Sequence, residues 1–398
     1  MQKFIVVLVT ACVALVAVGP GVGQAVDAPS VEEMRQWTAP QWIEESQRQG
    51  QTLAGLELAD RVRLHQLWAL CQMQTPPPGL VEEAQRVADR VFARFQTLPA
   101  EAREAEDFAE SSHAIDLSSA GYVMARLGQA AAVEPWARQV ADLEARADLW
   151  SQVGWGVAER REAPAWEAWR AQRDDLLKDM DPWDRVWWNL DDGALWLLMG
   201  DPERAHVEIQ KLSDADAKYV ALVSAIDLAL ELDLPRWVQR WQPQAEALAG
   251  LWGEAALDMQ VDLAGIKARQ GDPGPAQQLF DRVRRGDDPW LTVSLGSTLA
   301  VALHRAEQQA ASHEVIKALI KSAQPPAGGN AALDEESLSH WETIGSTCWQ
   351  TQNFDLLGEV WEVCGDSYPR ARVAAAIAVE MIWTQYTSRW QPKTPPPI

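Results

Sequence analysis

Hydrophobic positions along most of this chain recur three and four residues apart, as on one face of a helix, and short turns interrupt them. Between residues 109 and 366 the interruptions are regular. An apolar helix with a small residue near its middle is followed by a tight turn and a second apolar helix. The mid-helix positions lie 33 to 45 residues apart, at Gly121, Gly154, Gly193, Ile226, Ala264, Ala300 and Gly345. A repeat of this length is typical of a helical solenoid, in which each unit buries its apolar face against its neighbours.

The turns between the helices carry the residues that end and cap helices. Gly200-Asp201-Pro202 and Gly271-Asp272-Pro273 each supply a glycine to end one helix, an aspartate to cap the next and a proline for its first turn. Both segments predict helix-turn-helix corners. No sustained run of alternating β-branched residues bounded by hairpin turns occurs, so the sequence predicts an all-α fold, an α-solenoid of antiparallel helical hairpins.

The first 25 residues resemble a secretory signal. Lys3 precedes an apolar stretch from Phe4 to Val18, and Gly23-Gln24-Ala25 places small residues where signal peptidase requires them. We expect cleavage after Ala25 and a periplasmic or secreted protein, with no membrane insertion after cleavage. A membrane anchor is the alternative, but about 15 apolar residues fall short of the roughly 20 of a spanning helix. A lipoprotein signal at Cys12 is a second alternative, although the apolar run continues past that residue.

The remaining segments flank the regular repeats. Ser30 and Glu33 form a predicted capping box, and Pro76 to Pro78 separate two further helical stretches. The expected organisation is a signal peptide (1–25), an N-terminal helical cap or degenerate repeat (26–108), seven helical hairpins (109–366), a C-terminal capping helix (367–388) and a disordered Pro-rich tail (389–398).

The chain is strongly acidic. Its formal net charge is −22, which becomes −23 when Lys3 leaves with the signal. An acidic surface repels phosphate backbones and anionic lipids, so we expect no nucleic-acid partner. A basic partner or a neutral ligand is compatible with this charge, and the charge can also serve solubility alone.

Cysteines and histidines give no sign of a metal site or a cofactor. After the signal, Cys71, Cys348 and Cys364 remain. The last two lie on paired helices, but their offset from the turn places them roughly 9 to 10 Å apart along the axes, so buried thiols are expected. No two histidines stand three or four residues apart, and there is no Cys-x-x-Cys, phosphate loop or Gly-x-Ser-x-Gly elbow. These absences favour a non-catalytic protein.

The repeat resembles the tetratricopeptide repeat family. The matching positions are Trp150, Val153 and Gly154, then Trp341, Ile344 and Gly345 in first helices, and Ala205 with Ile209 and Ala276 with Phe280 in second helices. Ile226 stands where a small residue is expected, and several steps exceed the 34 residues of that family, which leaves other helical-hairpin repeats open. The resemblance implies a right-handed superhelix.

That resemblance also implies a concave groove lined by the first helix of each unit, with a protein or peptide as partner. Carried over position by position, the groove candidates are Tyr122, Arg126, Trp155, Trp187, Asp227, Asp258, Arg269, His304, Arg305 and Trp349. The alternative for each charged member is an ordinary solvated face.

Tryptophan and one carboxylate pair are the remaining candidates for chemistry. The chain has 21 tryptophans, which can fill gaps between helices or form a platform for sugar rings. Asp192 falls where the repeat expects a buried apolar residue, next to Asp191. A buried carboxylate there could serve as a general acid, but an error in the repeat register or pairing with an arginine such as Arg185 explains it more simply.

We therefore expect an exported, non-catalytic scaffold that binds a polypeptide in its groove. The first alternative is an α/α-toroid enzyme acting on polysaccharide, which predicts that the first and last hairpins touch and that carboxylates from different hairpins meet in a central cleft. The second is a structural component of an envelope assembly, which predicts large exposed apolar patches. The sequence does not specify the oligomeric state.

Overall fold

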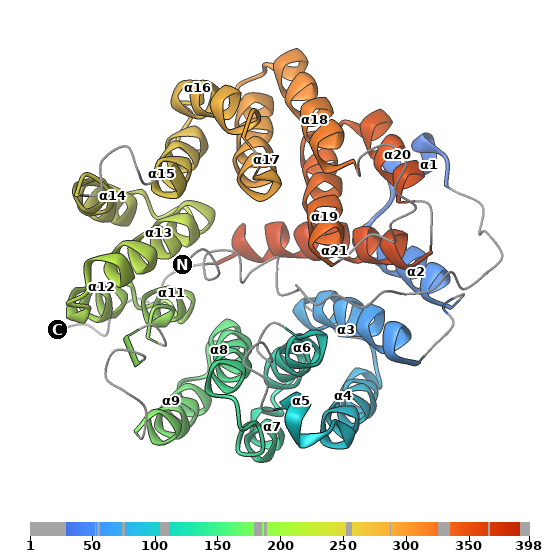
Figure 1. Ribbon diagram of the computed structural model, residues 1–398, viewed down its shortest axis with the longest axis vertical. Helices are drawn as coiled ribbons and strands as arrows, with labels where there is room; N and C mark the ends of the chain where they lie inside the picture. The colour runs from blue at the N-terminus through green and yellow to red at the C-terminus, as the bar shows by residue number, and fades with distance from the viewer. Residues whose placement is uncertain are drawn as a thin grey trace.

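The computed structural model describes residues 29–51, 53, 56–73, 76–103, 111–178, 185–186, 189–251, 257–286, 288–324, 335–364 and 367–390. Within these ranges the chain forms helices and no strands, which confirms the predicted all-α class (Figure 1). The predicted signal peptide and residues 391–398 of the predicted tail lie outside them. None of the helices in the described ranges combines the length and the apolar character that crossing a bilayer requires.

Consecutive helices pack against each other in pairs. The pairs are α3 (Leu56–Gln72) with α4 (Leu80–Thr97), α6 (Ser112–Arg126) with α7 (Ala130–Ala137), α8 (Leu143–Arg160) with α9 (Ala163–Leu177), α11 (Asp192–Leu198) with α12 (Pro202–Lys211), α13 (Ala215–Glu231) with α14 (Pro235–Ala249), α15 (Leu257–Arg269) with α16 (Gly274–Val283), α17 (Pro289–Arg305) with α18 (Gln309–Ala323), and α19 (Glu335–Gln350) with α20 (Phe354–Val363). In Figure 1 the first helix of each pair lies on the inner side and the second on the outer side of a ring.

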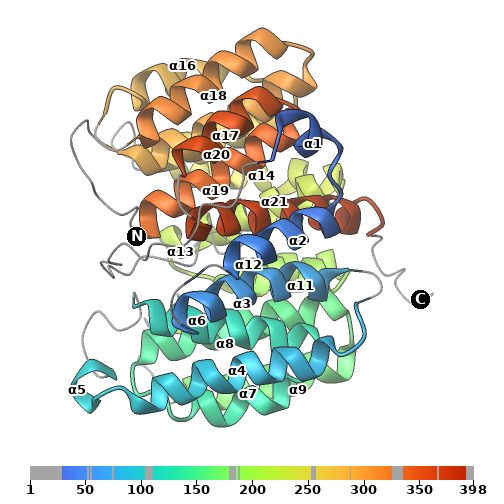
Figure 2. The same ribbon diagram turned by 90° about the vertical axis from the view of Figure 1, so that its right-hand side faces the viewer.

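The ring closes because the two ends of the described chain pack against each other. Helix α21 (Ser367–Thr387) contacts α19, α2 (Ala39–Gly50) and α3, while α1 (Val31–Gln36) contacts α20. Figure 2 shows α21, α2 and α3 side by side. The Ser46 hydroxyl donates a 2.7 Å hydrogen bond to the Ala371 carbonyl, and Arg372 forms a buried ion pair with Glu342. The short helix α5 (Ala100–Arg103) follows α4.

Glycines in the inner helices allow the close packing of neighbouring helices. A methyl group added at Gly154 would lie 2.8 Å from two ring atoms of Trp169 on the paired helix. In α17 the close approach occurs at Gly296, where a methyl group would lie 2.5 Å from Leu319. The sequence pattern had placed the small position of this repeat one turn later, at Ala300. A one-turn shift keeps a residue on the same helix face, which explains why spacing alone did not separate the two positions.

Buried aromatic rings fill the space between inner and outer helices. The tryptophans with almost no solvent exposure are Trp42, Trp150, Trp166, Trp169, Trp241, Trp341 and Trp361. Trp166 and Trp169 stack with their ring centres 4.8 Å apart. For these residues packing is the observed role, and only tryptophans that face the ring interior remain candidates for ligand contact.

The predicted corners and thiols can be compared directly with the structure. Gly200 adopts a left-handed conformation with φ of 83°, and the Asp201 carboxylate accepts a 2.9 Å hydrogen bond from the Arg204 backbone N–H, as expected. At the second corner the helix begins at Gly274, later than predicted, and the N-cap residue is Pro273 instead of Asp272. Asp272 lies one residue before the cap, where its Oδ1 accepts a 3.3 Å hydrogen bond from the Gly274 backbone N–H. The three cysteines beyond residue 29 are free and buried, which confirms the prediction.

Candidate functional site

The inner helices line a central, partly open cavity of about 520 Å³. Side chains from α3, α6, α8, α13, α15, α17, α19 and α21 line it, together with Asp191, which directly precedes α11. Elements far apart in the sequence therefore contribute to one space. The volume falls within the range of small-molecule sites in proteins.

Helix α21 forms one wall of this cavity. Its lining residues follow a single helical stripe: Ala376, Val379, Glu380, Trp383, Thr384 and Thr387. The Trp383 indole N–H donates a 2.8 Å hydrogen bond to Glu231 Oε2 on α13. After the end of α21, the Trp390 indole N–H donates a hydrogen bond to the Leu198 carbonyl at the end of α11. The last helix of the chain thus crosses the ring interior and occupies space that a continuous concave groove would need (Figure 1).

An arginine and two carboxylates from α13 and α15 form a neighbouring part of the cavity wall. Arg269 Nη1 lies 3.7 Å from Asp227 Oδ1 and 3.4 Å from Glu231 Oε1. The relative solvent exposure of these side chains is 31% for Arg269, 29% for Asp227 and 32% for Glu231. They are partly exposed because they face the cavity. Burial raises the pKa of both carboxyl groups, and the Arg269 charge opposes this shift. The Asp227 charge in turn raises the pKa of Arg269.

Among the residues that the structure describes, no arginine or lysine forms an ion pair with Asp262 on α15. Burial, reinforced by the nearby charge of Asp227, raises its pKa to about 8, so Asp262 holds a proton at pH 7. The Tyr219 oxygen lies 3.3 Å from Asp262 Oδ2 and 3.0 Å from the Met259 carbonyl. A tyrosine has one O–H and can donate to only one of these oxygens. A protonated Asp262 can donate to the Tyr219 oxygen while Tyr219 donates to Met259, so both contacts are satisfied.

Glu380 on α21 is a second carboxyl group with an altered pKa. Burial and the Glu231 charge raise its pKa to about 7, while Arg269 and Arg305 oppose the shift. Glu380 and Asp262 come from different helices and line the same cavity. Groups that titrate near neutral pH in a cavity are typical of functional sites.

The adjacent Asp191 and Asp192 have separate roles. Asp191 lines the cavity, and its Oδ2 accepts hydrogen bonds from Ser151 Oγ at 2.6 Å and from the Trp155 indole N–H at 3.3 Å. Asp192 instead forms a buried ion pair with Arg173 on α9. The expected pairing of Asp192 with an arginine is therefore present, but the partner is Arg173 and not Arg185.

The structure separates the sequence-predicted groove residues into groups. Those that line the cavity are Trp155, Asp227, Arg269 and Arg305. Tyr122 and Arg126 lie outside it and bind a common partner, since the Tyr122 hydroxyl donates to Glu159 Oε2 at 2.7 Å and Arg126 Nε lies 3.1 Å from the same oxygen. Asp258, His304 and Trp349 do not line the cavity, and Trp187 lies outside the described residues.

Sequence reasoning missed Glu231, Asp262, Glu380 and Trp383. Glu231 stands four residues after Asp227, so the i, i+4 rule could have found it on the same face of α13. Glu380 and Trp383 lie on α21, beyond the last repeat, where the repeat pattern assigns no inner face. Their positions follow only from ring closure.

No group of three His, Cys, Asp or Glu side chains in the described ranges is arranged to hold a metal ion. Comparisons of the chain with protein-family models, with curated proteins and with solved structures found no match. The tetratricopeptide resemblance and the right-handed superhelix accordingly stay predictions.

Proposed function

We propose that this chain is an exported, non-catalytic binding protein and that its ligand site is the central cavity. The observation that carries the proposal is the convergence of eight helices on one partly open central cavity of about 520 Å³. Its lining combines apolar surface, tryptophan rings and a small number of charged groups, the composition that is typical of small-molecule sites.

The cavity supports a compact ligand better than an extended polypeptide. Helix α21 lies across the ring interior, where its Trp383 donates a hydrogen bond to α13, and Trp390, which follows the helix, donates one to α11. A polypeptide passing through the ring would have to displace this helix, whose inner residues Val373 to Ala375 are fully buried. A small molecule, or one side chain of a partner, can enter without that cost.

A hydrolase acting on polysaccharide is the second candidate. Two observations favour it: helices from the two ends of the described chain pack against each other, α1 on α20 and α2 on α21, and carboxyl groups of raised pKa come from different helices of the same cavity. Glycosidases use such a pair, with one group protonated to act as the acid. Release of reducing ends from polysaccharides by the wild type, and its loss in Glu380→Gln, would support this function over simple binding.

The observations do not favour an envelope assembly. The exposed large apolar side chains in the described part of the chain are Val81, Leu143, Val207 and Leu251. They lie on α4, α8, α12 and the turn after α14, so they are scattered singly, which is ordinary for a protein surface.

A ligand screen with a filled-cavity variant tests the proposal. Ser224 lines the cavity on α13, so Ser224→Phe should fill part of it, whereas Ser322→Phe on the exposed side of α18 makes the same change elsewhere. Thermal unfolding is followed with a panel of sugars, amino acids and amines. A ligand at 100 times its Kd stabilises a protein by about 2.7 kcal/mol. We expect that stabilisation in the wild type and in Ser322→Phe, and its loss in Ser224→Phe.

Two results would overturn the proposal. One is a panel in which no compound stabilises the wild type. The other is a compound that stabilises Ser224→Phe as much as the wild type, because its site would then lie elsewhere.

A further inference from the structure

We propose that the ligand of the central cavity is an organic cation, a protonated or quaternary amine with small apolar groups, bound between the carboxyl groups of α13, α15 and α21 and the tryptophan rings. This inference rests on the proposed function of the cavity and names the class of its ligand.

The first step is the charge balance of the lining. Carboxyl groups outnumber the cationic side chains: Asp191, Asp227, Glu231, Asp262, Glu342 and Glu380 face Arg269, Arg305 and His65. Arg269 already lies between two of these carboxylates, and Glu342 is paired with Arg372. Burial and two nearby arginines lower the pKa of His65, which keeps it neutral. The cavity lining thus holds more carboxyl groups than its own cationic side chains can pair with.

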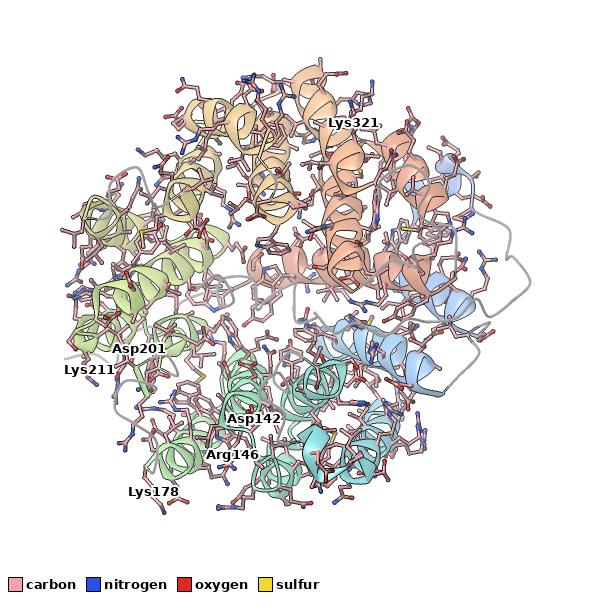
Figure 3. The ribbon with its side chains drawn as sticks, viewed as in Figure 1. Asp142, Arg146, Lys178, Asp201, Lys211 and Lys321 are labelled. Atoms are coloured by element: carbon pink, nitrogen blue, oxygen red, sulfur yellow. The ribbon has the colours of Figure 1, made fainter. Side chains whose placement is uncertain are left out.

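Two carboxyl groups are available for a ligand cation. Neither Asp262 nor Glu380 has a lysine or arginine within ion-pair distance in the described ranges. The charged side chains that act on Asp262 are other carboxylates, Asp227 and Asp258, and both disfavour its ionised form. The described residues that line the cavity include no lysine. The labelled Lys178, Lys211 and Lys321 lie on the outer side of the ring (Figure 3).

The second step is the aromatic lining, which is independent of charge. Trp68, Trp155, Trp290 and Trp383 contribute to the cavity wall. The indole N–H groups of Trp155 and Trp383 bind Asp191 and Glu231, which fixes both rings at the wall. Tryptophan faces attract alkylammonium groups more strongly than neutral groups of the same shape, and the attraction grows when water is excluded.

A third observation is an unused polar atom at the same wall. The Ser297 hydroxyl lines the cavity, its oxygen is inaccessible to solvent, and it has no hydrogen-bond partner in the part of the chain that the structure describes. Buried hydroxyl groups normally find a partner. A ligand N–H or O–H can supply it if the Ser297 side chain rotates so that its oxygen reaches the cavity.

Cation binding should release a proton. The groups that act directly on Asp262 are Tyr219 and Asp227 from α13 and Asp258 from α15 itself. The other charged or titratable groups from the surrounding helices line the same cavity: Glu231 from α13, Arg269 from α15, Arg305 from α17 and Glu380 from α21. Burial and the surrounding carboxylates keep a proton on Asp262 when the cavity is free. A ligand cation beside it favours the ionised form, so the proton leaves as the cation binds. Affinity should then rise with pH up to about 8.

Calorimetry on the full chain with matched cationic and neutral probes tests this inference. Choline is compared with 3,3-dimethyl-1-butanol, which has the same shape without the charge, and cadaverine is compared with 1,5-pentanediol. Glucose represents sugars. We expect at least one cation to bind about tenfold more tightly than its neutral counterpart. That cation should bind more tightly at pH 8.5 than at pH 6, with heats in phosphate and Tris buffers that reveal proton release.

A matched pair of variants locates the effect. Asp262→Asn should weaken cation binding about tenfold or more and remove most of its pH dependence, because the titrating group is absent. Asp281→Asn makes the same change on the exposed face of α16 and should bind as the wild type does. Thermal unfolding shows that both variants are folded.

The outcomes separate this inference from the proposed function. If glucose or a neutral probe binds as tightly as the cations and Ser224→Phe abolishes that binding, the cavity is a ligand site and the cation inference is wrong. If Asp262→Asn binds the cation as the wild type does, the inference is also wrong. If no probe binds at either pH, the cation inference fails outright, and the wider ligand screen decides the proposed function.

Discussion

The substitution Gly154→Ala tests whether the inner and outer helices pack as closely as the structure shows. Gly154 lies in the middle of α8, and Trp169 lies on its partner α9. The added methyl carbon would be 2.8 Å from Cε2 and Cη2 of Trp169 and closer still to Cζ2. Carbon atoms in contact normally stay about 3.5 to 4.0 Å apart, so one of the two helices has to move.

The Trp169 ring cannot easily give way. Its indole N–H donates a 3.0 Å hydrogen bond to the Trp150 carbonyl, it stacks on Trp166, and the Arg173 guanidinium lies 4.9 Å from its centre. Overpacking of a rigid site costs about 3 kcal/mol, at the upper end of measured values. Alanine regains about 1 kcal/mol over glycine inside a helix. The expected net loss of stability is therefore about 2 kcal/mol.

Gly265→Ala is the matched control. Gly265 is also inside an inner helix, but its added methyl carbon would meet only Thr298 Cγ2, at an ordinary distance of 3.6 Å. The propensity gain is then unopposed, and the variant should be about 1 kcal/mol more stable than the wild type. The two glycine-to-alanine changes should thus differ in sign.

Urea unfolding followed by tryptophan fluorescence and far-UV circular dichroism measures both variants. A double-mutant cycle with Trp169→Phe isolates the clash, because phenylalanine lacks the part of the indole that the added methyl group would meet. We expect Gly154→Ala to cost less in the Trp169→Phe background. The close packing of α8 on α9 would be refuted if Gly154→Ala were as stable as Gly265→Ala.

Three further predictions concern buried polar groups. Glu342→Gln should cost about 3 to 5 kcal/mol in urea unfolding because it leaves the Arg372 charge buried without its carboxylate, and adding Arg372→Met should recover part of that loss. The raised pKa values of Asp262 and Glu380 mean that the folded protein binds protons more tightly than the unfolded chain, so this contribution is complete below about pH 4 and is lost as pH rises through about 7 and 8. Melting temperatures at pH 5 and pH 9 should show a smaller decline in Asp262→Asn than in the wild type. Burial raises the pKa of the Cys364 thiol to about 12 and keeps all three described thiols inaccessible, so a thiol reagent should react with them only after unfolding.

Local features of the fold could be predicted because they depend on neighbours in the sequence. The Gly200-Asp201-Pro202 corner needs only its own residues, and the helical class follows from the spacing of apolar positions. Buried thiols followed from the unfavourable offset of Cys348 and Cys364 across one turn. In each case the physical cause lies within about 20 residues.

Ring closure and the site depend on contacts that local spacing does not encode. Ser46 and Ala371 are 325 residues apart, and no repeat pattern specifies that they meet. The groove residues were carried over from an open array, in which α21 only caps the end. Once α21 crosses the ring, Glu380 and Trp383 become part of the lining, while Asp258, His304 and Trp349 lie away from it. Asp227 and Arg269 were predicted from the sequence and also line the observed cavity, because they face inward in an open array and in a closed ring.

The distance between the two ends of the hairpin array tests the central claim, that the array closes into a ring around one cavity. Spin labels at Glu32→Cys on α1 and Asp355→Cys on α20, both exposed, serve this purpose, with the buried cysteines replaced by serine or alanine. In the ring the two helices touch: Arg35 lies 5.7 Å from the centre of the Phe354 ring. Pulsed dipolar spectroscopy should then give one short distance, that of labels on adjoining helices. A separation on the order of 80 Å, as expected for an open row of hairpins spaced by roughly 10 Å, would contradict the closed ring and the cavity with it.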